Sequence, residues 1–170
     1  MHPVRCSLLL AGLVLALSGC VSQPAKPGAS AEFQARSGSR VSGKAMLSDL
    51  GSDKLRVEVD ARDVPPGEHG FHIHEVGDCS AADASSAKGH YNPTGKRHGH
   101  HDKAERHAGD LPNLVADAAG TVKYSADLKG LSLKDVTGLS LIIHADPDDY
   151  ISQPAGNSGK RIACAVIRGL

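Results

Sequence analysis

The stretch Gly70-Phe71-His72-Ile73-His74-Glu75 places two histidines two positions apart between apolar residues. This alternation is typical of a β-strand, in which side chains at positions i and i+2 point to the same face. A strand here would aim both imidazoles at one point, which is the simplest way to present them to one metal ion. The pair alone is weak evidence, because many strands carry His-x-His by chance.

Five further candidate metal ligands follow this stretch. They are His90, His98, His107, Asp110 and His144. Neutral imidazole binds both copper and zinc, and a carboxylate completes a tetrahedral zinc site. His144 is decisive, because it ends an apolar run far from the others, where a strand could return it to the same place. The pattern predicts two adjacent transition-metal sites, and the alternative is a solvated histidine-rich loop.

Strand-like segments dominate the chain, and helical periodicity is not sustained anywhere. The expected strands cover residues 55–61, 70–75, 121–126, 139–143 and 162–167, with a weaker candidate at 40–47. Short strands with glycine-rich breaks are typical of an antiparallel sandwich or barrel. Two long polar segments, 76–114 and 145–160, are expected to be functional loops. The first has no strand pattern to anchor it, so we expect bound metal to order it.

Length and charge indicate a single domain that does not bind nucleic acid. The chain has 170 residues, which suits one ordinary domain. Lysine plus arginine and aspartate plus glutamate number 19 each, so nothing suggests nucleic acid as a partner. Aromatic residues make up only 3% of the chain, and the core must therefore consist of Val, Leu, Ile and Ala.

The N-terminus is typical of a targeting segment. Arg5 supplies a positive start, and residues 8–17 form an apolar stretch too short to span a bilayer comfortably. The following Leu17-Ser18-Gly19-Cys20 resembles the lipobox of bacterial lipoproteins, which predicts cleavage after residue 19 and a lipid on Cys20. In many Gram-negative bacteria an aspartate directly after the lipobox cysteine retains a lipoprotein in the inner membrane. This chain has Val21 at that position, which favours the outer membrane. An ordinary signal peptide with an incidental cysteine is the alternative.

These features divide the chain into a lipoprotein signal peptide (1–19), a lipidated flexible tether (20–33) and a folded domain (34–170). Residues 21–30 are rich in Pro, Ala and Ser, as flexible linkers are. Cys79 and Cys164 then remain in a compartment that permits disulfides. They either pair with each other or stay as two buried thiols.

Taken together, the motifs resemble those of copper/zinc superoxide dismutases of the bacterial envelope type. The resemblance covers residues 40–167: GFHIHE matches the copper motif of the family, and residues 156–167 (GNSGKRIACAVI) match its second signature. It implies an all-β fold, an antiparallel Greek-key β-sandwich or barrel of about eight strands with two long functional loops.

The resemblance also implies roles for individual residues. The implied copper ligands are His72, His74, His90 and His144. The implied zinc ligands are His90, His98, His107 and Asp110. One copper and one zinc per chain would thus share His90, which would also deliver a proton. Arg161 would guide the substrate anion, Asp148 would link the two metal sites behind the ligands, and Cys79 would pair with Cys164.

The implied reaction is the disproportionation of superoxide to oxygen and hydrogen peroxide, which would protect the bacterial cell envelope. The protein would be lipid-anchored there, facing either the periplasm or the exterior. A metal-storage module and a two-metal hydrolase are the alternatives, although a hydrolase usually needs bridging carboxylates and Asp110 is the sole ligand carboxylate. A monomer and a homodimer both remain open. We expect His69 to be a structural loop residue, and His100 and His101 to be solvated rather than extra chelators.

Overall fold

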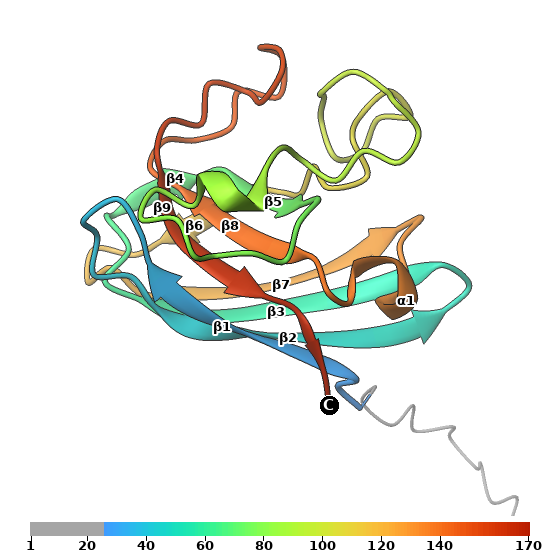
Figure 1. Cartoon of the computed structure of the whole chain (residues 1–170), viewed down its shortest axis with the longest axis horizontal. Coiled ribbons are helices and arrows are strands. Elements are labelled where there is room, and N and C mark those ends of the chain that lie inside the picture. Colours follow the sequence, from blue (N-terminus) through green and yellow to red (C-terminus); the bar gives the residue numbers. More distant parts are fainter. Residues whose placement is uncertain (1–25) are drawn as a thin grey trace, which may run out of the picture.

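Ten antiparallel strands make up most of the regular structure in residues 26–170, the part of the chain that the computed structural model describes (Figure 1). The strands are β1 (Ala29–Ala35), β2 (Ser42–Gly51), β3 (Lys54–Arg62), β4 (Gly67–His69), β5 (Phe71–His74), β6 (Leu114–Ala116), β7 (Val122–Lys129), β8 (Ser140–His144), β9 (Arg161–Val166) and β10 (Arg168–Gly169). The described helices are one turn each, η1 (Ser85–Ala87) and α1 (Leu133–Val136). The all-β prediction is confirmed, with short strands such as β4 and β10 added to the expected set.

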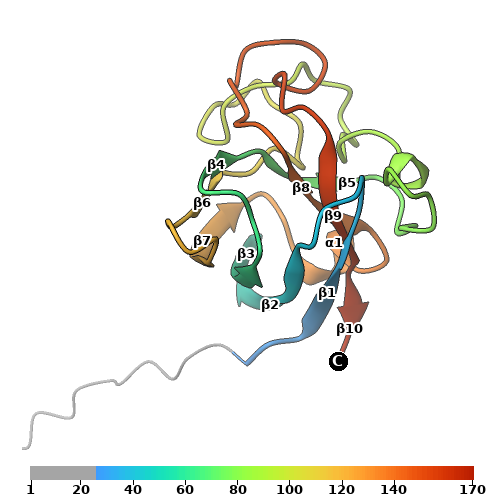
Figure 2. The ribbon, with the colours of Figure 1, turned by 90° about the vertical axis from the view of Figure 1, so that its left-hand side faces the viewer.

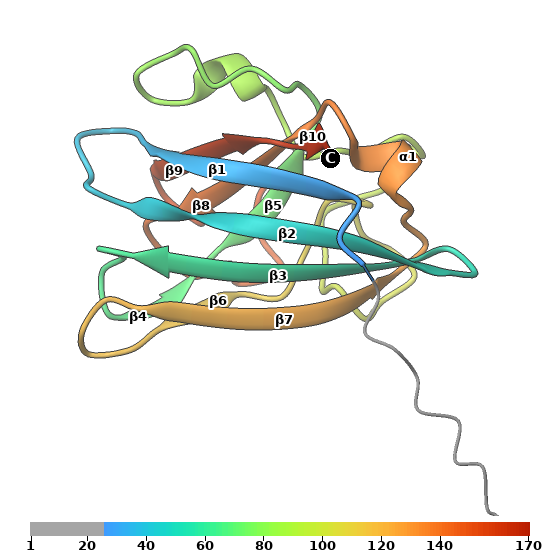
Figure 3. The same cartoon turned by 90° about the horizontal axis from the view of Figure 1, so that it is seen from below.

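The strands follow one another around a nearly closed barrel in the order β4-β6-β7-β3-β2-β1-β9-β8-β5. Strand β1 connects the two halves, because its first part pairs with β2 and its last two residues pair with β9. Figure 3 shows β1, β2, β3 and β7 side by side on one wall of the barrel. The later, yellow-green part of the first long loop and the second long loop lie at the same end of the molecule, above β5 and β8, whereas the green part with η1 lies at the side (Figure 2).

Burial differs between the two walls in a way that locates the site. Strand β3 alternates buried and exposed residues, as a strand with one solvated face does. Strands β5 and β8 are buried at every position. In β5, Phe71 and Ile73 join the hydrophobic core, so His72 and His74 point to the opposite face, where the long loops cover them.

The first long loop is fastened to the sheet, contrary to our expectation that nothing in the sheet anchors it. The Ile73 amide donates to the Gly109 carbonyl at 3.0 Å, and the Tyr91 amide donates to the Ile73 carbonyl at 2.8 Å. A Cβ atom on Gly109 would lie 2.3 Å from the Ile73 carbonyl oxygen, so only glycine allows this approach. Backbone pairing with β5 therefore orders the loop.

The folded domain begins earlier than the sequence predicts. The expected tether extends to residue 33, whereas β1 starts at Ala29. Ala29, Ala31 and Phe33 alternate into the core, but two of these three side chains are small and give little hydrophobic signal. The signal peptide and Cys20 lie outside the described residues. Within residues 26–170, no helix is long and apolar enough to cross a membrane.

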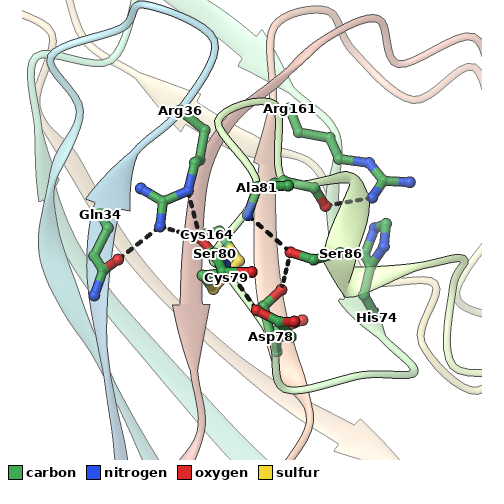
Figure 4. The surroundings of a disulfide bond; sticks show 12 residues. Gln34, Arg36, His74, Asp78, Cys79, Ser80, Ala81, Ser86, Arg161 and Cys164 are labelled. Atoms are coloured by element: carbon green, nitrogen blue, oxygen red, sulfur yellow. Dashed lines mark hydrogen bonds between the residues drawn. A yellow bond between two sulfur atoms is a disulfide. The ribbon is translucent and has the colours of Figure 1, made fainter.

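A disulfide between Cys79 and Cys164 fastens the start of the first long loop to β9. The two Cα atoms are 5.7 Å apart, and the bond closes a sequence separation of 85 residues. Arg36 supports the same corner, because its Nε donates to the Cys79 carbonyl at 2.8 Å. The paired-cysteine prediction is therefore confirmed, and the disulfide surroundings are drawn in Figure 4.

Replacing both cysteines by alanine should destabilise the protein strongly. On the chain-entropy model, closing a loop of this length stabilises a fold by about 4–5 kcal/mol. Each kcal/mol shifts the melting temperature of a domain of this size by about 2–4 °C, so we expect a drop of about 10 °C or more. Calorimetry of the metal-loaded protein measures it, and a drop below about 3 °C would show that the disulfide contributes little.

Candidate metal centre

Four buried histidines, here called the first cluster, converge above the sheet. They are His72 and His74 from β5, His144 from the end of β8, and His90 from the first long loop. One ring nitrogen from each lies within 4.8 Å of those of the other three. The strand pairing explains this convergence, because β5 pairs with β8 and His74 forms a bridge with His90.

The hydrogen bonds of the first cluster leave one nitrogen of each ring free. In three rings the other nitrogen lies against a protein oxygen outside the second cluster: His72 Nε2 against Asp148 Oδ2 at 2.8 Å, His74 Nδ1 against the Lys88 carbonyl at 2.9 Å, and His144 Nδ1 against the Gly159 carbonyl at 3.4 Å. Within residues 26–170, four nitrogens of this cluster remain buried without a hydrogen-bond partner: His72 Nδ1, His74 Nε2, His90 Nε2 and His144 Nε2. Unpartnered buried polar atoms are rare, and four converging ones fit a transition-metal ion.

The second cluster comprises His90, His98, His107 and Asp110. Asp110 Oδ1 lies 2.8, 3.0 and 3.3 Å from the Nδ1 atoms of His90, His98 and His107. Zinc bonds of about 2.0–2.1 Å in a tetrahedron would place ligand atoms about 3.3 Å apart. The donor set and its spacing therefore fit zinc.

His90 belongs to both clusters. Its Nε2 is the free nitrogen that faces the first cluster, and its Nδ1 faces Asp110 in the second. The ring stacks on His72 with a centroid distance of 3.9 Å. One imidazole can thus contact two metal ions, one through each nitrogen.

Asp148 links the two clusters from behind. Its carboxylate oxygens lie 2.8 Å from His72 Nε2 and 2.9 Å from His98 Nε2. Gly156 leaves the space for it, because a Cβ atom there would lie 1.8 Å from Asp148 Oδ1, and its φ of +67° favours glycine. The predicted position of Asp148 between the sites agrees with this geometry.

Two residues that hold His98 and Asp148 in place were not predicted from the sequence. Gln153 accepts from the His98 amide and donates to the His98 carbonyl, both at 2.9 Å. Asn113 donates to the Asp148 carbonyl at 3.1 Å and accepts from the Asp148 amide at 3.0 Å. Amide side chains in long loops carry no distinguishing sequence signal, because solvated loops contain them equally often.

Arg161 lies beside the first cluster, at the start of β9. It is the ladder partner of His144, and its guanidinium donates to the carbonyls of Ala84 and Lys88, both at 2.7 Å. Figure 4 shows Arg161 next to His74. After burial and neighbouring histidines, the charge of Arg161 is a further cause that lowers the pKa of His74. A fixed cation thus stands at the edge of the cluster.

His69 has the structural role that we expected, although it lies in β4 rather than in a loop. The side chain is buried, and its ring nitrogens lie 2.8 Å from the His144 carbonyl and 2.6 Å from the Pro65 carbonyl. It therefore fastens the end of β8, which carries His144, to the segment before β4.

Burial and hydrogen bonding shift the pKa values of individual cluster histidines in opposite directions. Burial lowers the pKa of His72 and His74 well below the usual range, and lowers that of His144 to about 3. Burial alone would also lower the pKa of His98, but hydrogen bonds to Asp110 and Asp148 raise it to about 9. The imidazoles of His72, His74 and His144 are therefore neutral at pH 7, the form that binds a metal.

The metal-free protein should lose stability as the pH falls. Unfolding returns the buried imidazoles of His72, His74 and His144 to an ordinary pKa near 6.5, so below that pH the unfolded chain takes up protons that the folded chain refuses. His98 acts oppositely, because its contribution is present below pH 6.5 and is lost as the pH rises through about 9. Calorimetry of chelator-treated protein should show a falling melting temperature from about pH 6.5 towards about pH 4. A constant value would contradict the assignment.

Comparison with known proteins agrees with this geometry. The family model "Copper/zinc superoxide dismutase (SODC)" matches residues 41–167. The relative "Superoxide dismutase [Cu-Zn] 2" of Aquifex aeolicus is 43% identical over 173 residues, covering 96% of this chain and 99% of the relative. "Superoxide dismutase [Cu-Zn] 1" of the same organism is 44% identical, covering 74% of this chain and 79% of its own. The crystal structure of the clock protein EA4 has a TM-score of 0.77 and 32% identity, covering 85% of this chain and 96% of that one.

The chain belongs to the copper/zinc superoxide dismutase family. Its reaction is the disproportionation of superoxide to oxygen and hydrogen peroxide, and its metals are copper and zinc. The expected enzyme class, substrate and cofactors are thereby confirmed, and the metal-storage and hydrolase alternatives are set aside.

Proposed function

We propose that this dismutase is anchored to the bacterial cell envelope by a lipid on Cys20 and protects the envelope from superoxide. The lipobox-like Leu17-Ser18-Gly19-Cys20 supports the anchor, and the disulfide suits an oxidising compartment. Because β1 starts at Ala29, only residues 21–28 separate the lipid from the barrel. Eight extended residues reach about 28 Å, which would hold the domain near the membrane. Val21 favours the outer membrane.

We assign copper to the first cluster and zinc to the second. One observation supports the copper site above all: four buried imidazole nitrogens without partners converge, while hydrogen bonds orient three of the four rings. The zinc site rests on the spacing around Asp110 Oδ1. When bound, copper would supply one-electron redox chemistry, whereas zinc is not redox active. His90 would offer its Nδ1 to the second cluster.

His90 and Arg161 are the residues that we assign to the reaction itself. His90 Nε2 faces the first cluster, so when its lone pair is not bound to metal it can hold a proton there and release it to the reduced oxygen species. The guanidinium of Arg161, fixed by two carbonyl groups, attracts a small monoanion to the edge of the cluster and holds it by charge-assisted hydrogen bonds. Asp148 and Gln153 do not face the substrate and act by positioning the ligands.

Replacing Arg161 by alanine should slow superoxide turnover while leaving copper and zinc contents unchanged. A fixed cation raises the local concentration of an anionic substrate, and salt screens that effect, so the variant should also depend less on ionic strength. Arg161→Lys is the matched control, because it keeps the charge and loses the paired donors. We expect at least about a tenfold loss in kcat/KM for alanine, equivalent to about 1.4 kcal/mol. An unchanged rate for Arg161→Ala would remove the assigned role.

Replacing Cys20 by serine should release the protein from membranes. We expect the wild-type chain, produced in a Gram-negative host, to sediment with membranes and to incorporate labelled palmitate, since stable anchoring needs acyl chains. The Cys20→Ser variant should be soluble and unlabelled, with normal turnover per copper ion. Cys6→Ser is the control, because Cys6 lies in the predicted signal peptide. Wild-type protein without label would overturn the anchor but leave the dismutase activity unaffected.

A further inference from the structure

Three adjacent residues of the first long loop form a group of metal-binding side chains outside the two clusters. They are His100, His101 and Asp102, and one donor atom from each lies within 4.8 Å of the others. The side chains of His100 and His101 are 38% and 24% exposed, so the group opens to solvent. It shares no residue with the first or second cluster.

The atoms of this group already lie near the spacing that a metal ion requires. Asp102 Oδ2 lies 4.0 Å from His100 Nδ1, and Asp102 Oδ1 lies 3.6 Å from His101 Nε2. Ligands about 2.0–2.1 Å from a tetrahedral zinc ion would be about 3.3 Å apart. The two distances to Asp102 would therefore need to shorten by less than about 1 Å.

The hydrogen bonding of the two rings is compatible with one donor lone pair on each. The Asp102 amide donates to His100 Nδ1 at 3.2 Å, so this nitrogen carries a lone pair rather than a proton, and a metal ion would take the place of that long hydrogen bond. His101 Nδ1 is buried and has no hydrogen-bond partner among the described residues. If that nitrogen carries the ring proton, Nε2 offers its lone pair towards Asp102, as in metal sites with a neutral imidazole.

The surroundings fix the two rings rather than leave them to move freely. The rings of His100 and His101 lie 4.1 Å apart, and Tyr150 of the second long loop contacts His100 at a centroid distance of 4.6 Å. Tyr150 is itself fixed, because its hydroxyl accepts from the Asn113 amide at 2.8 Å. Two imidazoles held side by side lose little conformational freedom when they bind an ion.

We propose that His100, His101 and Asp102 form a third metal site, which binds Zn²⁺ at the surface of the loop that carries the zinc ligands. This proposal departs from the sequence-based expectation that the two histidines are only solvated. Two imidazoles and a carboxylate leave at least one position for water, so the site is open and exchangeable. His98 lies two residues before His100, yet its ring faces inward to Asp110 and Asp148. The third site is therefore adjacent to the second cluster but separate from it.

Zinc content at controlled free zinc tests this site in the intact, metal-loaded enzyme. The wild type and the variant His100→Gln/His101→Gln are dialysed against the same series of buffered free Zn²⁺ concentrations, and zinc per chain is measured by mass spectrometry. We expect the wild type to take up one more zinc ion per chain than the double variant. Lys103→Gln is the control for a change in the same loop that removes no metal ligand, and it should behave as the wild type.

Two further measurements keep the result interpretable if the double variant folds poorly. Asp102→Asn changes one exposed side chain, and it should weaken the additional zinc by at least about tenfold. Cu²⁺ added to the loaded wild type should give a new electron paramagnetic resonance signal with coupling to two imidazole nitrogens. The third site would be overturned if the wild type and the double variant bound equal amounts of zinc. It would also be overturned if the Asp102→Asn variant bound the additional zinc ion as tightly as the wild type does. Superoxide turnover should be the same in all variants.

Discussion

The backbone pairing between the first long loop and strand β5 is the constraint on which the metal centre depends. His74 forms a bridge with His90, and His72 forms one with Asp110, so one strand fixes the position of both clusters. Gly109 is necessary, because any side chain there would collide with the Ile73 carbonyl. Without this pairing, His90 would have no defined position between the two clusters. Backbone hydrogen bonds to the sheet therefore hold the loop in place.

The two clusters also depend on one another through Asp148. A single buried carboxylate accepts from His72 of the first cluster and His98 of the second, and thereby turns Nδ1 of each ring towards its own cluster. The second long loop that carries Asp148 is joined to the first by Gln153, whose amide bonds both the amide and the carbonyl of His98. A substitution that moves the ligands of one cluster should therefore also move the ligands of the other through these contacts.

The ligand set and the main strands could be predicted because their signals are local. The alternation in β3 and the His-x-His spacing of β5 follow from the two-residue period of a strand. Strand β1 could not be recognised, because alanines at buried positions look like linker residues. Gln153 and Asn113 were missed for a different reason: their partners lie 55 and 35 positions away, and only the fold brings them together.

Superoxide turnover, measured together with metal content in the same sample, tests the central claim most directly. The domain from Val21 onward would be purified, loaded with copper and zinc, and assayed with and without cyanide. The metal centre described above predicts fast, cyanide-sensitive dismutation at about one copper and one zinc per chain. Full loading without turnover would contradict it, and would leave a protein that binds metals but does not use them for catalysis.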